Sequence, residues 1–140
     1  GGNDLIRRTT PTEAPAQPTV DGQEFAIQAA HIASDNRAED VVVLDLRGLS
    51  SVADFFVIAT ATSDRQMRAI IDQIEEAGLR VGQRPYGMSG LDTSTWMLAD
   101  YVDVVIHIFS PDRRRYYDLE LLWGDAPRVE WQRPAAVAAN

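Results

Sequence analysis

The feature that most constrains the fold of this chain is a pair of apolar runs near its end. Residues 96–101 and 104–109 are rich in aliphatic and aromatic side chains, and only two residues separate them. Two such runs with a very short gap are typical of a β-hairpin. A hairpin is marginal by itself, so the rest of the chain must supply a sheet and a covering layer.

A helix is predicted directly after this hairpin. Ser110 has the position of an N-cap and Pro111 that of the first helical residue, a combination favoured at helix starts. Apolar side chains then recur at helical spacing and a glycine follows them. These residues are Tyr116, Leu119, Trp123 and Gly124. We therefore expect one helix that closes at the glycine.

Two more helices are predicted upstream, and each begins with a capping box. Asp21 pairs with Glu24 in the first, which should end near residues 35–36. Ser63 pairs with Gln66 in the second, and Gly78 occupies the position of a C-terminal glycine cap. The second helix also carries an apolar stripe formed by Met67, Ile70, Ile71 and Ile74.

Strands are expected between these helices. Residues 41–46 and 54–61 form short apolar runs, and residues 79–87 form a third strand or an extended connection, followed by a loop over 88–94. The order is helix, strand, strand, helix, strand, hairpin, helix. This predicts an α/β fold at the border with α+β, a single domain with a mixed five-stranded sheet flanked by helices.

The ends of the chain are expected to lie outside this domain. Residues 1–20 contain three prolines without apolar periodicity, which predicts a disordered N-terminal tail or a remnant of tag cleavage. Residues 21–133 are the predicted domain, in which Trp131 adds a short strand or a packing anchor. Residues 134–140 are expected to fray.

Composition excludes several classes of function. The net charge is −8, so a dominant direct contact with nucleic acid is not expected. The chain has no cysteine, which removes thiolate catalysis and cysteine zinc sites, and all 13 of its basic residues are arginine. No apolar run is long enough for a membrane span. These observations predict no membrane association and no cofactor, and nothing calls for an oxidising compartment.

His107 is the one histidine within a predicted strand, on the same face as Val105 and Phe109. It has three interpretations: a half-buried histidine hydrogen-bonded to a neighbour, a partner contact, or a catalytic or metal-binding group. Metal sites need further ligands at suitable spacing, and none is evident. We predict no catalytic residue and no metal site.

The carboxylates Asp100 and Asp103 raise one rival, a metal-dependent enzyme of nucleotidyltransferase type. Such an enzyme places two carboxylates on alternate strand positions beside a glycine-rich phosphate loop. Here the two are three residues apart, on opposite faces if the strand continues, and no such loop is present. Asp100 is better explained as part of the hairpin turn.

Aromatic residues with polar atoms are more frequent in the last third than a core of this size requires. They are Trp96, Tyr101, Tyr116, Tyr117 and Trp123. Arginines 113–115 open the last helix, where cations oppose the helix dipole. They are either solvated and paired with nearby carboxylates, or at least one contacts a partner. Trp, Tyr and Arg dominate protein–protein hot spots, so these residues indicate a binding module.

The same residues carry a resemblance to a known family. The most specific block runs from Trp96 through Asp100 and Asp103-Val-Val-Ile-His107-Ile-Phe to Leu122-Trp123-Gly124. Shorter matches lie at Asp45-Leu46, Ser50-Ser51, Asp54-Phe55, Ala61-Thr62-Ser63 and Arg65-Gln66. Over residues 25–123 the chain resembles the ribosomal silencing factor family (RsfS, or Iojap-like proteins). It departs at Val102, where relatives usually carry glycine, and this leaves the turn geometry open.

The resemblance implies a fold similar to that of nucleotidyltransferases, without their catalytic residues. It implies binding to the large ribosomal subunit through ribosomal protein uL-fourteen, which would block joining to the small subunit and repress translation. It also implies a homodimer when free and a location in the bacterial cytoplasm. An acidic chain suits a basic ribosomal protein as partner.

Seven residues form the predicted partner-binding surface: Trp96, Leu98, Asp100, His107, Tyr117, Leu119 and Trp123. Trp96 and Leu98 are expected to face the partner, and Asp100 is expected to pair with a partner cation.

Overall fold

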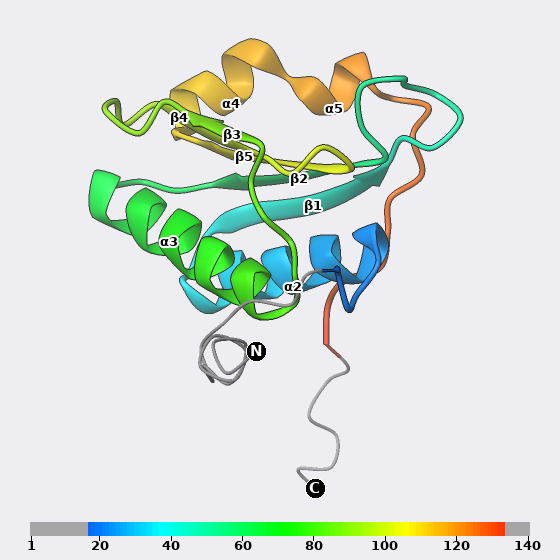
Figure 1. Ribbon diagram of the computed structural model, residues 1–140. Helices are drawn as coiled ribbons and strands as arrows, with labels where there is room; N and C mark the ends of the chain where they lie inside the picture. The colour runs from blue at the N-terminus through cyan, green and yellow to red at the C-terminus, as the bar shows by residue number, and fades with distance from the viewer. Residues whose placement is uncertain (1–16, 134–140) are drawn as a thin grey trace, which may run out of the picture.

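A five-stranded mixed sheet lies at the centre of the computed structural model, which describes residues 17–133 (Figure 1). The helices are α2 (Gly22–Asp35), α3 (Asp64–Arg80), α4 (Pro111–Tyr117) and α5 (Leu119–Leu122). The strands are β1 (Glu39–Asp45), β2 (Phe55–Thr60), β3 (Gly87–Ser89), β4 (Trp96–Asp100) and β5 (Val104–Phe109). The expectations for residues 1–16 and 134–140 lie outside the described part.

The strand order is β1-β2-β5-β4-β3, in which β2 and β5 are parallel and all other neighbours are antiparallel. The predicted single domain with a mixed five-stranded sheet, at the border of α/β and α+β, is confirmed. The predicted hairpin is also confirmed, with Trp96 opposite Phe109 and Asp100 opposite Val105. The two strands at the centre, β2 and β5, are buried along their whole length.

Helices cover both faces of the sheet, α2 and α3 one face and α4 and α5 the other (Figure 1). The layer under α2 and α3 includes Phe25, Val57, Ile70, Ile74, Met97 and Ile106. The layer under α4 and α5 includes Leu46, Phe56, Ile58, Val105 and Phe109. Alternate residues of a strand point to opposite faces, so β4 directs Met97 and Ala99 to the first layer and Trp96, Leu98 and Asp100 to the second.

Both predicted N-caps begin a helix, but only Asp21 forms the full capping box. At Ser63 the hydroxyl accepts from Gln66 N–H at 3.1 Å, whereas the Gln66 side chain accepts from Thr62 N–H and not from Ser63, so the second box is incomplete.

The end of α3 also differs from the prediction. The helix passes through Gly78 and continues to Arg80. A Cβ on Gly78 would lie 2.8 Å from the carbonyl oxygen of Gln83 and 3.3 Å from the ring of Phe25. The glycine is therefore required by the close approach of the Gln83 carbonyl after α3 and of Phe25 from α2, and not as a helix cap.

The third strand is also displaced from its predicted place. It forms over Gly87–Ser89, within and beside the stretch expected to be a loop, and pairs with β4. Pro85 has no N–H to donate to a ladder. The first backbone hydrogen bond to β4 comes just after it, from Tyr86 N–H to the Asp100 carbonyl oxygen at 2.6 Å.

The last helix divides in two at Asp118, so the prediction of one continuous helix is wrong. Asp118 adopts a left-handed conformation with φ of 39°. Its N–H donates to the Arg114 carbonyl oxygen at 3.0 Å, and its side chain accepts from Leu121 N–H at 3.3 Å. Aspartate tolerates this conformation and caps the following helix. As a result Tyr116 faces solvent while Leu119 packs on the sheet.

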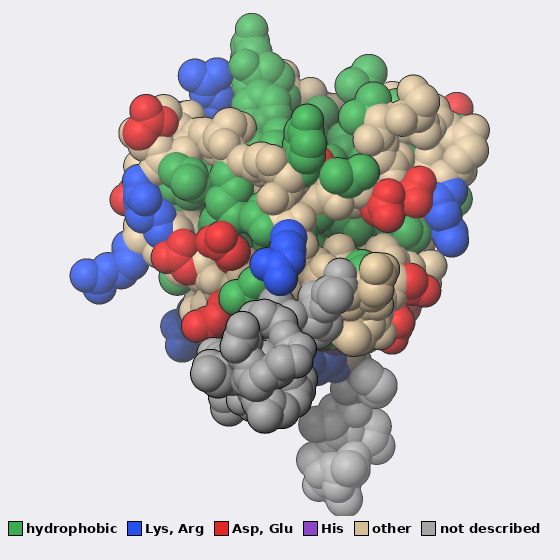
Figure 2. Space-filling view, in the orientation of Figure 1, with side chains coloured by type: hydrophobic (Ala, Val, Ile, Leu, Met, Phe, Trp, Pro, Cys, Tyr) green, Lys and Arg blue, Asp and Glu red, His purple; other side chains and the backbone are tan. Residues whose placement is uncertain are grey.

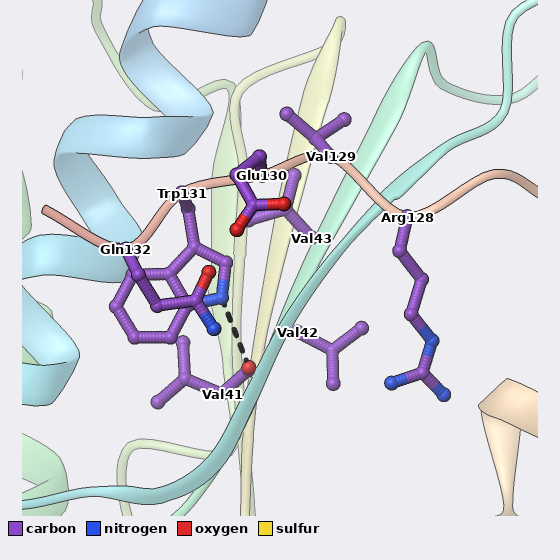
Figure 3. Close-up of a pocket in the computed structure, with 8 residues that line it drawn as sticks. All are labelled: Val41, Val42, Val43, Arg128, Val129, Glu130, Trp131 and Gln132. Carbon is purple, nitrogen blue, oxygen red and sulfur yellow. Dashed lines mark hydrogen bonds between the residues drawn. The ribbon is translucent and has the colours of Figure 1, made fainter. Parts of the chain in front are cut away.

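Both ends of the described chain pack on the domain. Thr19 N–H donates to the Val81 carbonyl oxygen at 2.8 Å, and Val20 packs on the core, although residues 17–20 were expected to belong to the tail. Figure 3 shows the C-terminal segment beside β1, where Trp131 Nε1–H donates to the Val41 carbonyl oxygen at 3.1 Å. Val129 N–H donates to Val43. This segment covers an edge that would otherwise be open to pairing.

Val102 in the hairpin turn provides a test of backbone strain. Its φ is +73°, a conformation that costs a β-branched residue about 1–2 kcal/mol. Val102→Gly removes this strain and loses about 0.5–1 kcal/mol through the freedom of glycine in the unfolded chain. We expect a net rise of up to about 1 kcal/mol in the free energy of unfolding, measured by urea denaturation. Val52→Gly, at an exposed valine without positive φ, should be neutral or destabilising. A loss of stability in Val102→Gly would contradict this account.

Tyr101 provides a second test, within the layer under α2 and α3. Its ring packs edge-on against Phe25 at 4.7 Å, and its hydroxyl is buried with no hydrogen-bond partner among the described residues. Burial, with a smaller effect from Glu75, raises the pKa of this hydroxyl well above its usual range. Removing an unsatisfied buried hydroxyl relieves a desolvation cost of about 1–3 kcal/mol, so Tyr101→Phe should raise the free energy of unfolding by about 1 kcal/mol. Tyr116→Phe, at an exposed tyrosine, should change it by less than about 0.5 kcal/mol. Equal effects in the two variants would contradict this reasoning.

Candidate functional site

The candidate site lies on the sheet face that α4 and α5 cover. Trp96, Leu98 and Asp100 reach this face from β4, and His107 reaches it from the adjacent β5, opposite Leu98. Tyr117 reaches it from the end of α4. Leu119 and Trp123 pack on the same layer beyond the kink. The structure therefore places all seven predicted residues on one side of the molecule.

An aromatic cluster forms the centre of this site, and Trp96 is its hub. The Trp96 ring lies 4.6 Å from Tyr117, 4.9 Å from Phe109 and 5.9 Å from His107, measured between centroids. Trp96 Nε1–H donates to His107 Nδ1 at 3.2 Å. We call Trp96, His107, Phe109 and Tyr117 the aromatic cluster. Its members support one another, so the indole of Trp96 is fixed before any partner arrives.

His107 is more deeply placed than the sequence indicated. It is only 5 % exposed, below Trp96 and edge-on to Phe56 at 4.6 Å. Burial lowers the pKa of His107 to about 4, so the ring is neutral at pH 7. Because Nδ1 accepts the bond from Trp96, the proton is on Nε2, which has no partner among the described residues. The His107 side chain is therefore not part of the exposed surface, and it contributes to the site by accepting the hydrogen bond that orients the Trp96 indole.

Asp100 lies on the same face, at the other end of β4. Its Oδ1 accepts a hydrogen bond from Val102 N–H at 2.8 Å, which is the turn role expected from the sequence. Asp103, the other carboxylate of the hairpin, lies in the turn, where its backbone carbonyl accepts from Asp54 and Phe55. The two carboxylates do not form a paired site.

The three arginines of α4 have different environments. Arg114 is only 10 % exposed and donates to Glu120 at 2.9 Å, to Thr60 Oγ1 at 2.9 Å and to the Asp40 carbonyl oxygen at 2.7 Å. Arg115 pairs with Asp112. Arg113 donates to the Tyr117 hydroxyl at 3.3 Å and pairs with no carboxylate in residues 17–133. Arg114 and Arg115 therefore match the interpretation of arginines paired with carboxylates, and Arg113 is the candidate for a partner contact.

Two exposed leucines beside the cluster were not predicted from the sequence. Leu121 and Leu122 are 77 % and 70 % exposed, next to Tyr116, which is 77 % exposed and was among the predicted binding aromatics. Figure 2 shows hydrophobic side chains gathered over the side of the molecule where α4 and α5 lie. The sequence pattern did not reveal the break in the helix at Asp118, after which both leucines point away from the sheet. Such a contiguous exposed apolar surface is typical of a protein interaction site.

The described residues contain no group of three or more His, Cys, Asp or Glu side chains placed to hold a metal ion. Asp45 is paired with Arg47 at 2.7 Å, which holds the pKa of this carboxyl below its usual value. None of the described helices has the length and apolarity to cross a bilayer.

Comparison with known proteins identifies the family. Residues 19–140 match the family described as "Ribosomal silencing factor during starvation". A Bacillus subtilis protein named ribosomal silencing factor RsfS is 48 % identical over 106 residues, which are 73 % of this chain and 86 % of that protein. A protein of the same name from Halalkalibacterium halodurans is 40 % identical over 111 residues, 79 % of this chain and 95 % of its own length.

A solved structure agrees with this match. A crystal structure of a Chromobacterium violaceum protein is similar with a TM-score of 0.71 at 30 % identity, and the alignment covers 86 % of this chain and 100 % of that one. The family match spans the sheet, the four helices of residues 17–133 and the aromatic cluster. The chain belongs to the ribosomal silencing factor family.

Proposed function

We propose that this protein is a ribosomal silencing factor that binds the large ribosomal subunit through ribosomal protein uL-fourteen. The observation that carries the proposal is the aromatic cluster beside exposed apolar residues, in a chain that belongs to this family. Aromatic anchors held in place before binding are typical of interface hot spots. The net charge of −8 complements a basic ribosomal protein and would speed their encounter.

The proposed mechanism is steric. A domain bound on the face of the large subunit that meets the small subunit would prevent the two from joining, and translation would fall. No covalent step is required, so the protein acts by occupancy alone. We further propose that it works in a bacterial cytoplasm and forms a homodimer when free of the ribosome.

A subunit-joining assay tests this mechanism. Purified large and small subunits are mixed with increasing amounts of the protein, and joined ribosomes are measured by light scattering. We expect joining to fall in proportion to the occupancy of the large subunit. Undiminished joining at saturating occupancy would contradict the steric mechanism. Inhibition that follows binding to the small subunit would contradict the proposed partner.

A thermal-shift measurement addresses the rival enzyme function. A nucleotidyltransferase-type enzyme would bind a nucleoside triphosphate in the presence of Mg²⁺, and ligand binding raises the melting temperature. We expect no shift with ATP or GTP and Mg²⁺ at concentrations up to millimolar. A metal-dependent shift would favour the enzyme.

A further inference from the structure

A pocket adjoins the aromatic cluster on the side of β3. Its volume is about 340 Å³, and its lining comes from β3, β4, the connection between these strands, and α4: Ser89, Gly90, Thr95, Trp96, Leu98 and Arg113. Trp96 and Leu98 supply the apolar wall. Arg113 is the only charged residue in this lining. The pocket therefore combines an apolar surface with a single cation.

The cation of Arg113 is held in place without being neutralised. Its Nη1 donates to the Tyr117 hydroxyl at 3.3 Å, and its guanidinium carbon lies 5.8 Å from the centre of that ring. The neighbouring Arg114 and Arg115 are both paired with carboxylates, at Glu120 and Asp112. Among the arginines of α4, Arg113 alone has no such partner within the described residues.

We infer that this pocket receives an apolar side chain of the partner protein, next to a carboxylate that pairs with Arg113. This inference rests on the proposed function and adds to it the chemistry of one contact. A planar guanidinium bound to tyrosine is suited to a carboxylate, which accepts two parallel hydrogen bonds. The apolar wall beside it is suited to a neighbouring aliphatic or aromatic side chain.

A carboxylate is favoured over a nucleic-acid phosphate by the surroundings of Arg113. Binding to phosphates relies on several cations acting together, and Arg114 and Arg115 are already engaged. The chain as a whole carries a charge of −8 and repels RNA. Asp100, on the same face, carries a negative charge, whereas Arg113 carries a positive one. The two ends of this face would therefore select a cation and a carboxylate, respectively, on the partner. Such a pattern fixes orientation and rejects wrong partners more than it adds affinity.

Charge reversal at Arg113 tests the inference. We expect Arg113→Glu to weaken binding to isolated large subunits by at least ~30-fold, Arg113→Gln to weaken it by about 10-fold, and Arg113→Lys to have a smaller effect. Arg84→Glu is the matched control, because this exposed arginine lies on the α3–β3 connection and undergoes the same change of charge. It should bind within about 2-fold of the original protein. The melting temperature of each variant verifies folding, and Arg113→Gln serves if the charge reversal fails to fold.

The outcomes separate this inference from the proposed function. If the unchanged protein does not bind large subunits, the proposed function fails. If it binds and Arg113→Glu and Arg113→Gln bind equally well, the inference alone is overturned. If the Arg113 variants bind large subunits less well, they are tested against isolated uL-fourteen and against protein-free ribosomal RNA. A loss with the isolated protein supports the carboxylate, and a loss seen only with RNA overturns it in favour of a phosphate.

Discussion

Trp96→Ala is expected to weaken binding to the large ribosomal subunit by at least ~2 kcal/mol, about 30-fold in affinity. The indole is the hub of the aromatic cluster, in contact with Tyr117, Phe109 and His107. It also forms one wall of the pocket beside Arg113. Removing it deletes the central contact area and leaves His107 Nδ1 without its donor. Affinity would be measured by titration of labelled protein with large subunits.

Trp131→Ala is the matched control for this variant. Trp131 is also partly buried and also donates from its indole N–H, but to Val41 on β1, at the edge of the sheet far from β4. Its loss should lower stability without changing the affinity of the folded protein. If Trp96→Ala binds as the original protein does, the hot spot is assigned to the wrong residue. If it unfolds, Trp96 is a core residue.

Acidification between pH 6.5 and pH 4 is expected to lower the free energy of unfolding by about 3 kcal/mol through His107 alone. Burial lowers the pKa of His107 from 6.5 to about 4 in the folded protein, whereas the unfolded chain keeps the ordinary value. Above pH 6.5 both states are neutral and His107 contributes nothing to the pH dependence. Below it the unfolded state binds a proton that the folded state does not, so stability falls until the pH reaches the folded pKa.

The measurement is urea denaturation at a series of pH values, with His107→Leu as the test variant. The rings around His107 belong to Trp96, Phe56 and Phe109, none of which carries a charge. Asp35 and Asp45 have pKa values lowered by hydrogen bonds from arginine, so their contributions are lost mainly below pH 4. His107→Leu should lack the decline between pH 6.5 and 4, and His31→Gln should retain it. Identical profiles for His107→Leu and the original protein would contradict the buried neutral histidine.

Local signals predicted those parts of the fold that depend on neighbouring residues. The capping box at Asp21, the N-cap at Ser63 and the hairpin over 96–109 rest on contacts within a few residues, and the structure contains all three. The role of Gly78 depends on the nearby Gln83 carbonyl and on Phe25, which lies 53 positions away in the sequence and on another helix. From the sequence alone, a glycine that caps a helix cannot be distinguished from one that leaves space for a neighbouring group.

The break in the helix at Asp118, within the candidate site, was likewise not predicted from the sequence. The sequence contains the helical spacing of Tyr116, Leu119 and Trp123, but this spacing does not specify whether one helix continues. The break lies at Asp118, and the adjoining Arg114 side chain contacts Thr60 and the backbone of Asp40 on distant strands. The exposure of the leucines that follow could not be predicted without those contacts.

The depth of His107 was likewise beyond the sequence. Its alternation with Val105 and Phe109 predicted the correct face of the strand. How deeply that face is covered depends on α4 and on the ring of Phe56 from a neighbouring strand. The assignment of the seven predicted residues to partner contact remains a prediction, and His107, at 5 % exposure, could take part only beneath Trp96.

Co-sedimentation with separated ribosomal subunits tests the central claim most directly. The protein is mixed with large subunits, small subunits and joined ribosomes from a related bacterium, and each mixture is resolved on a sucrose gradient. The proposed function predicts that it migrates with large subunits, and with neither small subunits nor joined ribosomes. Migration with small subunits, or with none of the three, would contradict it.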